Sequence, residues 1–181
     1  MAKPTSASFP PIGRALPART LARDRRVRLR RARAADLDAL VAINVVADVH
    51  NHRLVPDVGG RRIDRRRARH YWKHALRSPR AAVWVAARGP GLLGVIGVDL
   101  LVARSRLAPA RRLVYLHSLW VQPAARRLGL GRALTQAAMA WGRRLGATQA
   151  RLEVAVPNAG ARRLYQGLGF AERELLLVRP I

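Results

Sequence analysis

Six consecutive residues carry the strongest signal in this chain: Arg126-Arg127-Leu128-Gly129-Leu130-Gly131. An apolar run over residues 113–121 precedes them, and a run with helical spacing over residues 132–145 follows. The sequence therefore predicts a strand, a glycine-bearing loop and a helix start at one point. The backbone N–H groups of such a loop meet the positive end of a helix dipole, and glycine lets a bulky anion approach closely. We expect a phosphate-bearing ligand here, although the same glycines would also suit a tight turn without a ligand.

Length and composition limit the classes of protein to which this chain can belong. At 181 residues, half of them apolar, the chain is large enough for one domain with a proper core. It has no apolar run of the roughly 18–20 residues that span a bilayer, so we expect no membrane segment. The absence of cysteine excludes disulfides, thiolate metal sites and a cysteine nucleophile. We expect a cytoplasmic protein without a metal site.

The charge is strongly positive, with 35 Lys+Arg against 10 Asp+Glu and a formal net charge of +25. Such a field attracts nucleic acid, ribosomal surfaces and anionic cofactors. Genome-wide compositional drift, with arginine filling solvated positions, would give the same composition. Both interpretations of the charge stay open at this stage.

The chain divides into a basic tail over residues 1–26, which we expect to be disordered, and one domain over residues 27–181. Periodicity and turn residues predict the following elements. They are a strand at 27–30, a helix from Asp36, a loop at 50–60, a helix at 64–76, strands at 82–87 and 92–102 joined by a turn at 89–91, a loop at 104–109, a strand at 113–121, a helix at 132–145, a strand at 151–156, a helix at 158–167 and a strand at 170–178. The strand–helix–strand over residues 113–156 implies a parallel pair inside a mixed sheet with helices on both faces.

Two segments make this order resemble the GCN5-related N-acetyltransferase (GNAT) superfamily. In the first, Arg126, Gly129 and Gly131 occupy the defining places of the motif Q/R-x-x-G-x-G/A. The second reads Leu152-Glu153-Val154, then Asn158-x-x-Ala161-x-x-Leu164-Tyr165-x-x-Leu168-Gly169-Phe170. The resemblance implies an α/β fold whose mixed, mostly antiparallel sheet has a splayed central parallel strand pair. It also implies acetyl-CoA as cosubstrate and an amine as acceptor.

The resemblance then implies a cofactor site. The backbone of residues 126–131 would hold the pyrophosphate, and the edge of the strand at 119–121 would hydrogen-bond the pantetheine arm. The residues implied to contact acetyl-CoA are Leu119, Trp120, Val121, Arg126, Arg127, Leu128, Gly129, Leu130, Gly131, Arg132, Asn158 and Tyr165.

Three residues are candidates for the chemistry. Tyr165, two helical turns after Asn158, matches the tyrosine that commonly protonates the coenzyme A thiolate in this family; the alternative is a tyrosine packed in the core. Glu153 matches a glutamate proposed as base in protein amino-terminal acetyltransferases, and would otherwise pair with an arginine. His117 stands where many relatives carry an acid, and is either a base or an ordinary strand histidine. Without cysteine, we expect direct transfer in a ternary complex.

The acceptor is open between a small-molecule amine and a protein amino terminus or lysine. The arginine-rich second helix disfavours polycationic acceptors and favours amines on anionic bodies. An alternative function is a non-catalytic protein of the same fold that binds nucleic acid through its arginines. Association with ribosomes, a homodimer and a longer acyl donor are compatible with the sequence.

Overall fold

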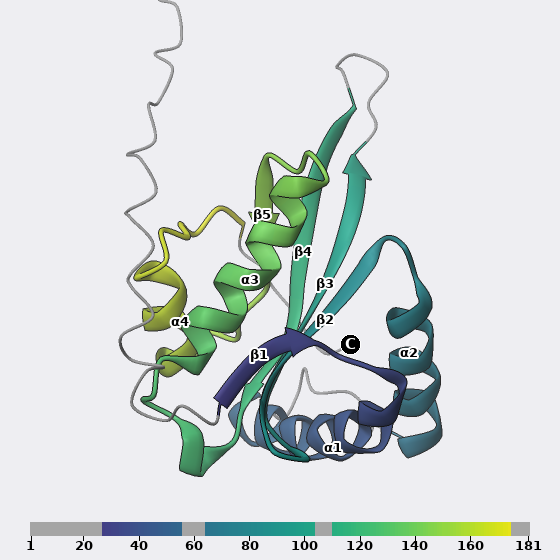
Figure 1. Ribbon diagram of the computed structural model, residues 1–181. Coiled ribbons are helices and arrows are strands. Elements are labelled where there is room, and N and C mark those ends of the chain that lie inside the picture. Colours follow the sequence, from purple (N-terminus) through teal and green to yellow (C-terminus); the bar gives the residue numbers. More distant parts are fainter. Residues whose placement is uncertain (1–26, 56–63, 104–109, 175–181) are drawn as a thin grey trace, which may run out of the picture.

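The computed structural model describes residues 27–55, 64–103 and 110–174. Within them, five strands form one sheet in the order β1-β2-β3-β4-β5 (Figure 1). The strands are β1 (Val27–Arg31), β2 (Ala81–Arg88), β3 (Gly91–Ala103), β4 (Arg111–Val121) and β5 (Gln149–Arg151). The helices are α1 (Leu37–Leu54), α2 (Arg65–Arg77), α3 (Leu130–Arg144) and α4 (Ala159–Gln166), with short 3₁₀ turns η2 (Ala34–Asp36) and η3 (Pro123–Ala125). No helix of the described residues is long and apolar enough to cross a membrane.

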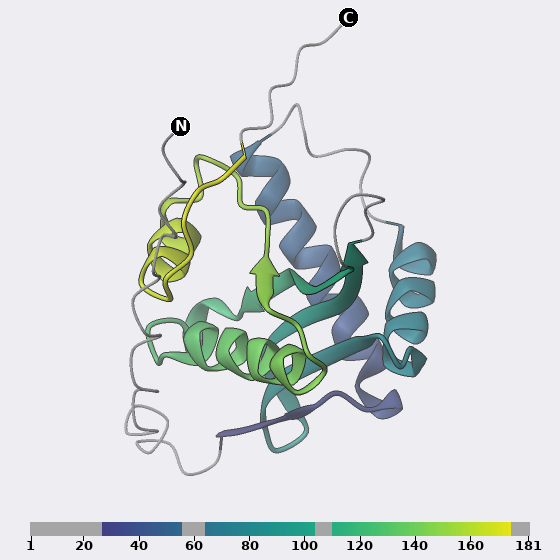
Figure 2. The same cartoon turned by 90° about the horizontal axis from the view of Figure 1, so that it is seen from above.

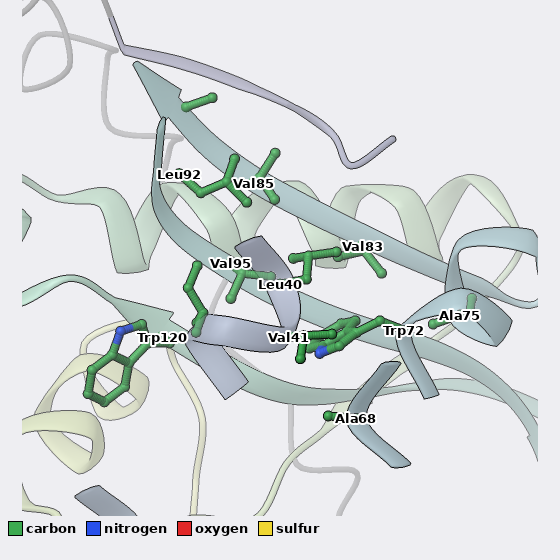
Figure 3. Close-up of a cluster of buried hydrophobic side chains, with 13 residues drawn as sticks. Leu40, Val41, Ala68, Trp72, Ala75, Val83, Val85, Leu92, Val95 and Trp120 are labelled. Atoms are coloured by element: carbon green, nitrogen blue, oxygen red, sulfur yellow. The ribbon is translucent and has the colours of Figure 1, made fainter. Parts of the chain in front are cut away.

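Helices cover both faces of the sheet (Figure 2). One face packs against α1 and α2, and Figure 3 shows this cluster around Leu40, Trp72 and Val95. The other face packs against α3, around Leu134 and Ile96. Neighbouring strands run antiparallel except β4 and β5, which run parallel. The predicted mixed, mostly antiparallel sheet is therefore confirmed, with its parallel pair at one end of the described strands.

The hairpin, the long central strand and the two middle helices follow the predicted ranges closely, but three predictions need correction. The loop expected from residue 50 is wrong in its first part, because α1 continues to Leu54. Residues 37–55 contain no glycine or proline that would end the helix earlier, and Pro56 disfavours helical conformation at the residue before it, Val55.

The last two predicted strands are also shorter or missing. β5 stops at Arg151 instead of residue 156, because it pairs with β4 over three residues and then diverges. Residues 170–174 form no strand, and the rest of that predicted strand lies outside the described residues, as do residues 1–26 and the loop at 104–109. Extended, apolar sequence becomes a strand only where a partner supplies the hydrogen-bond ladder.

A β-bulge interrupts β4 near its end. Val95 is opposite Trp120 and Gly97 is opposite His117, so Ser118 and Leu119 together face one residue of β3. Ser118 has a left-handed φ of 54°, which is uncommon outside glycine. A bulge bends its strand and re-aims the side chains around it. The bulge lies directly before the loop that the sequence singles out.

Candidate active site

The loop between β4 and α3 has the geometry of an anion-binding cradle. Arg127 and Gly129 both take left-handed φ values, 65° and 79°, and Gly129 is the N-cap of α3. The first bond of the helix runs from the Ala133 N–H to the Gly129 carbonyl, 3.0 Å. The amides of residues 130–132 therefore have no intrahelical acceptor and stand at the positive end of the dipole. Successive amides in alternating right- and left-handed conformations form a concave nest for an anion.

Both the amide and the side chain of Arg126 form hydrogen bonds within the protein. Its amide donates to the Pro123 carbonyl at 3.2 Å, and its Nε donates to the Val121 carbonyl at 3.1 Å. Its guanidinium lies 5.0 Å from the Trp120 ring centroid, and the His50 ring meets that same ring edge-on, with centroids 5.4 Å apart. Arg126 thus fixes the loop to the end of β4, and the amides of residues 127–132 are left for a ligand.

The edge of β4 toward β5 is open over its second half. β5 pairs with Leu113, Val114 and Tyr115, and no later residue of β4 has a partner on that side in the described chain. Leu119 and Val121 pack toward α3, whereas Trp120 packs toward α1 and α2. The backbone of residues 116–121 is therefore available for strand-like hydrogen bonds to an extended ligand.

Tyr165 lies on α4, next to the start of α3. A Cβ on Gly131 would meet Leu164 at 3.1 Å, which shows how closely the two helices approach. Asn158 caps α4, because its Oδ1 accepts the Ala161 N–H at 3.1 Å. The Tyr165 side chain is buried and packs edge-on against Phe170. Burial removes water from the hydroxyl and raises the pKa of Tyr165 to about 12.

His117 is held by residues from three elements on the face that α1 and α2 cover. Its Nδ1 lies 2.8 Å from the Tyr71 hydroxyl of α2 and 3.2 Å from the Ser118 hydroxyl. Its Nε2 lies 3.3 Å from a carboxylate oxygen of Asp99 on β3. Both ring nitrogens therefore have protein partners. Burial, followed by the nearby Asp99 charge, raises the pKa of Tyr71 above its usual value, so this hydroxyl stays protonated.

Glu153 joins the same group of side chains through Tyr115. The Glu153 carboxylate lies close enough to the Tyr115 hydroxyl for its charge to act on that hydroxyl. Burial, followed by that carboxylate's charge, raises the pKa of Tyr115. The Tyr115 ring also stacks on His117, with centroids 6.3 Å apart. The two residues that the sequence suggested as bases, Glu153 and His117, thus belong to one connected network. Glu153 is exposed, so one of its carboxylate oxygens can meet a substrate.

Sequence analysis missed three members of this network: Tyr71, Asp99 and Tyr115. Asp99 gave a usable signal, because it is a single carboxylate inside an otherwise apolar strand. Tyr71 gave none, since its contact with His117 depends on how α2 packs over the sheet. Among the described residues, no group of three or more His, Asp or Glu side chains could hold a metal ion.

Comparison with known proteins gives one family. Residues 46–170 match the family model described as "Acetyltransferase (GNAT) family". An N-alpha-acetyltransferase of Sulfurisphaera tokodaii is 31% identical over 153 residues, which cover 82% of this chain and 83% of the relative.

Solved structures share the fold. A variant of the BH1408 protein from Bacillus halodurans superposes with a TM-score of 0.76 and 17% identity, covering 85% of this chain and 99% of that one. A predicted acetyltransferase from Clostridium acetobutylicum, solved with acetyl-CoA, has a TM-score of 0.69 and 15% identity over 85% of this chain and 96% of that one.

Proposed function

This chain belongs to the GNAT family of acetyltransferases, and we propose that it acetylates the amino terminus of a polypeptide by direct transfer from acetyl-CoA. Family membership confirms the expectation of an acetyl-CoA-dependent N-acetyltransferase that the two motifs gave. The single observation that carries the choice of acceptor is the relative from Sulfurisphaera tokodaii, an N-alpha-acetyltransferase that matches over most of both chains.

The donor fits the loop and strand described above. The amides of residues 127–132 would hold the pyrophosphate, and the open edge of β4 would hold the extended pantetheine arm. Asn158 shapes this region by capping α4, which carries Tyr165. Acetyl-CoA supplies an activated thioester. The protein has to orient it, to take a proton from the attacking amine and to donate a proton to the leaving sulfur.

Tyr165 serves as the proton donor to the leaving sulfur. With a pKa of about 12 the hydroxyl keeps its proton throughout the neutral range, so it is always in the donor form. As the amine nitrogen bonds to the acetyl carbon and the carbon–sulfur bond breaks, negative charge collects on sulfur. A buried hydroxyl stabilises that charge more strongly than water does, because the site is partly desolvated.

Glu153 serves as the base that takes the proton from the attacking amine. Its carboxylate is exposed and can meet the amine, whereas both nitrogens of His117 already have partners. His117 therefore acts as a positioning residue: it holds Tyr115 by stacking and is itself held by Tyr71 and Asp99. In this scheme Asp99 orients the imidazole through its contact with Nε2.

A thiol-release assay tests this function. Acetyl-CoA is offered with a decapeptide that has a free amino terminus, with the same peptide blocked at its amino terminus and carrying a lysine, and with an aminoglycoside. We expect release with the free amino terminus alone, and mass spectrometry should place the acetyl group there. Transfer to the lysine peptide or the aminoglycoside alone would refute the proposed acceptor.

The net charge of +25 favours a second candidate function, that of a non-catalytic protein of the same fold that binds nucleic acid. Calorimetry separates the two functions, because the enzyme must bind acetyl-CoA and a non-catalytic protein need not. Absence of acetyl-CoA binding together with tight RNA binding would support the second function. Association with ribosomes and formation of a homodimer remain predictions from the sequence.

A further inference from the structure

The outer face of α2 carries a strong positive charge. Five arginines and one lysine lie in the helix from Arg65 to Arg77, and Asp64 directly before it is the one acid within residues 64–77. Its Oδ1 accepts the Arg66 amide at 2.9 Å, so Asp64 is engaged as the helix cap. Arg69 pairs with Asp38 of α1. The part of the chain that the structure describes gives the other cations of α2 no ion pair.

The positions of these cations oppose helix stability. Arg65, Arg66 and Arg67 occupy the first turn of α2, where the positive end of the helix dipole disfavours further positive charge. The dipole and the three guanidinium groups reinforce one another as a local attraction for anions. An arrangement that costs helix stability and concentrates one sign of charge favours a ligand of the opposite sign.

The charged face borders a hollow that leads to the reactive network. The hollow holds about 760 Å³ and is lined by Asp64, Arg66, Arg67, His70, Tyr71 and His74. Tyr71 is the connection, because its ring lines the hollow and its hydroxyl lies 2.8 Å from His117 Nδ1. The acceptor's amine must come near Glu153 and Tyr115, which stacks on His117, so the rest of the acceptor can lie along α2.

We propose that the acceptor is a polypeptide with acidic side chains immediately after the amino terminus that is acetylated, held by Arg66 and Arg67 in the hollow along α2. This inference rests on the proposed function and names its substrate class. Arg67 lies one helical turn, about 6 Å, before Tyr71. An extended peptide advances about 3.3 Å per residue, so its acidic residues would stand near the second to fourth positions.

The observations favour a peptide over RNA at this face. The hollow adjoins residues suited to deprotonate an amine, and RNA offers no aliphatic amine to acetylate. Proteins that bind single-stranded RNA present exposed aromatic rings for base stacking. Among the described residues that line this hollow, Tyr71 is the one tyrosine, tryptophan or phenylalanine, and its hydroxyl is already engaged by His117.

The test compares two decapeptides that are identical except for glutamate or glutamine at positions two to four. Thiol release with the full-length protein gives kcat/KM for each peptide at low and high salt. Two exposed charge pairs lead us to expect a preference on the order of tenfold for the glutamate peptide, weakening as salt screens the charges.

Matched variants test whether Arg66 and Arg67 cause the preference for the glutamate peptide. The double variant Arg66→Gln/Arg67→Gln should lose the preference, because kcat/KM for the glutamate peptide falls to the value for the glutamine peptide. The control Arg143→Gln/Arg144→Gln removes an equal number of positive charges, from exposed positions at the end of α3, and should keep the preference. Both variants change exposed side chains, and circular dichroism checks that each one is folded.

Each other outcome has a definite meaning. Equal kcat/KM for the two peptides would overturn the inference and leave the amino-terminal acetyltransferase intact, whereas no transfer to either peptide would remove the proposed function itself. An equal loss in both double variants would attribute the preference to overall charge and overturn the inference. If oligouridylate binds through Arg66 and Arg67 while the peptides show no preference, the face is an RNA site.

Discussion

Replacing Gly97 with alanine tests the position of His117 directly. A Cβ at residue 97 would lie 2.0 Å from His117 Cε1, 2.5 Å from Nδ1 and 2.8 Å from Nε2. No rotation of a methyl group relieves contacts this short, so the imidazole has to leave. It then loses the Tyr71 hydroxyl and the Asp99 carboxylate together.

The magnitude follows from two opposing effects. Each lost polar contact costs about 0.5–1.5 kcal/mol, so the displaced ring costs roughly 1–3 kcal/mol of unfolding free energy. Alanine in a strand interior restores about 0.5–1 kcal/mol relative to glycine. In a His117→Ala background the ring is gone, so Gly97→Ala should be neutral or stabilising. The coupling energy between the two positions is therefore about 1–3 kcal/mol.

Urea unfolding followed by tryptophan fluorescence measures this coupling across the wild type, both single variants and the double variant. The thiol-release assay on the same four proteins should show equal losses of kcat/KM for all three variants, since each removes the same ring from its place. A coupling energy below about 0.5 kcal/mol would show that the two residues do not meet and would refute the reasoning.

Three further changes have defined outcomes. Tyr165→Phe should lower kcat by about 10²–10⁴ and leave acetyl-CoA affinity by calorimetry unchanged, because it removes a proton donor from a buried ring; full turnover would remove Tyr165 from the mechanism. Gly142→Ala should destabilise the protein by about 1–3 kcal/mol in urea, because its Cβ would lie 2.4 Å from Val114 Cγ1, within van der Waals overlap of β4. Asp36→Asn should cost stability near pH 7 and progressively less in acid: the Arg30 hydrogen bonds lower the pKa of Asp36, so its contribution is full above about pH 4, its unfolded pKa, and disappears as pH falls through the lower folded pKa. An equal stability difference between this variant and the wild type at pH 2 and pH 7 would contradict that account.

The parts of the fold that sequence predicted well are those that depend on local pattern. The helix after Gly129 and the hairpin around residues 89–91 are specified by neighbouring residues, through periodicity, caps and turn chemistry. The same holds for the motif itself, since one glycine and its neighbours set the left-handed loop. The family followed from two such motifs and was confirmed by the comparisons.

The parts that sequence could not predict depend on long-range register. Asp99 meets His117 because β3 and β4 pair with Gly97 opposite His117, and no local pattern encodes that pairing. The strand expected after Arg151 failed for the same reason, since its length is set by where β5 leaves β4. The roles of Tyr165, Glu153 and His117 stay predictions, because they concern a substrate complex.

One extra residue in β4 determines how the two halves of the site are assembled. Side chains alternate along a strand, so an uninterrupted β4 would place Leu119, two residues after His117, on the face that holds His117. The bulge at Ser118 resets this alternation, and Trp120 takes that face instead, while Leu119 and Val121 pack toward α3. The strained φ of Ser118 is the local cost of this arrangement. It lets a single strand present an imidazole to the proposed acceptor side and, a few residues later, an open backbone edge that leads into the loop proposed to hold the pyrophosphate.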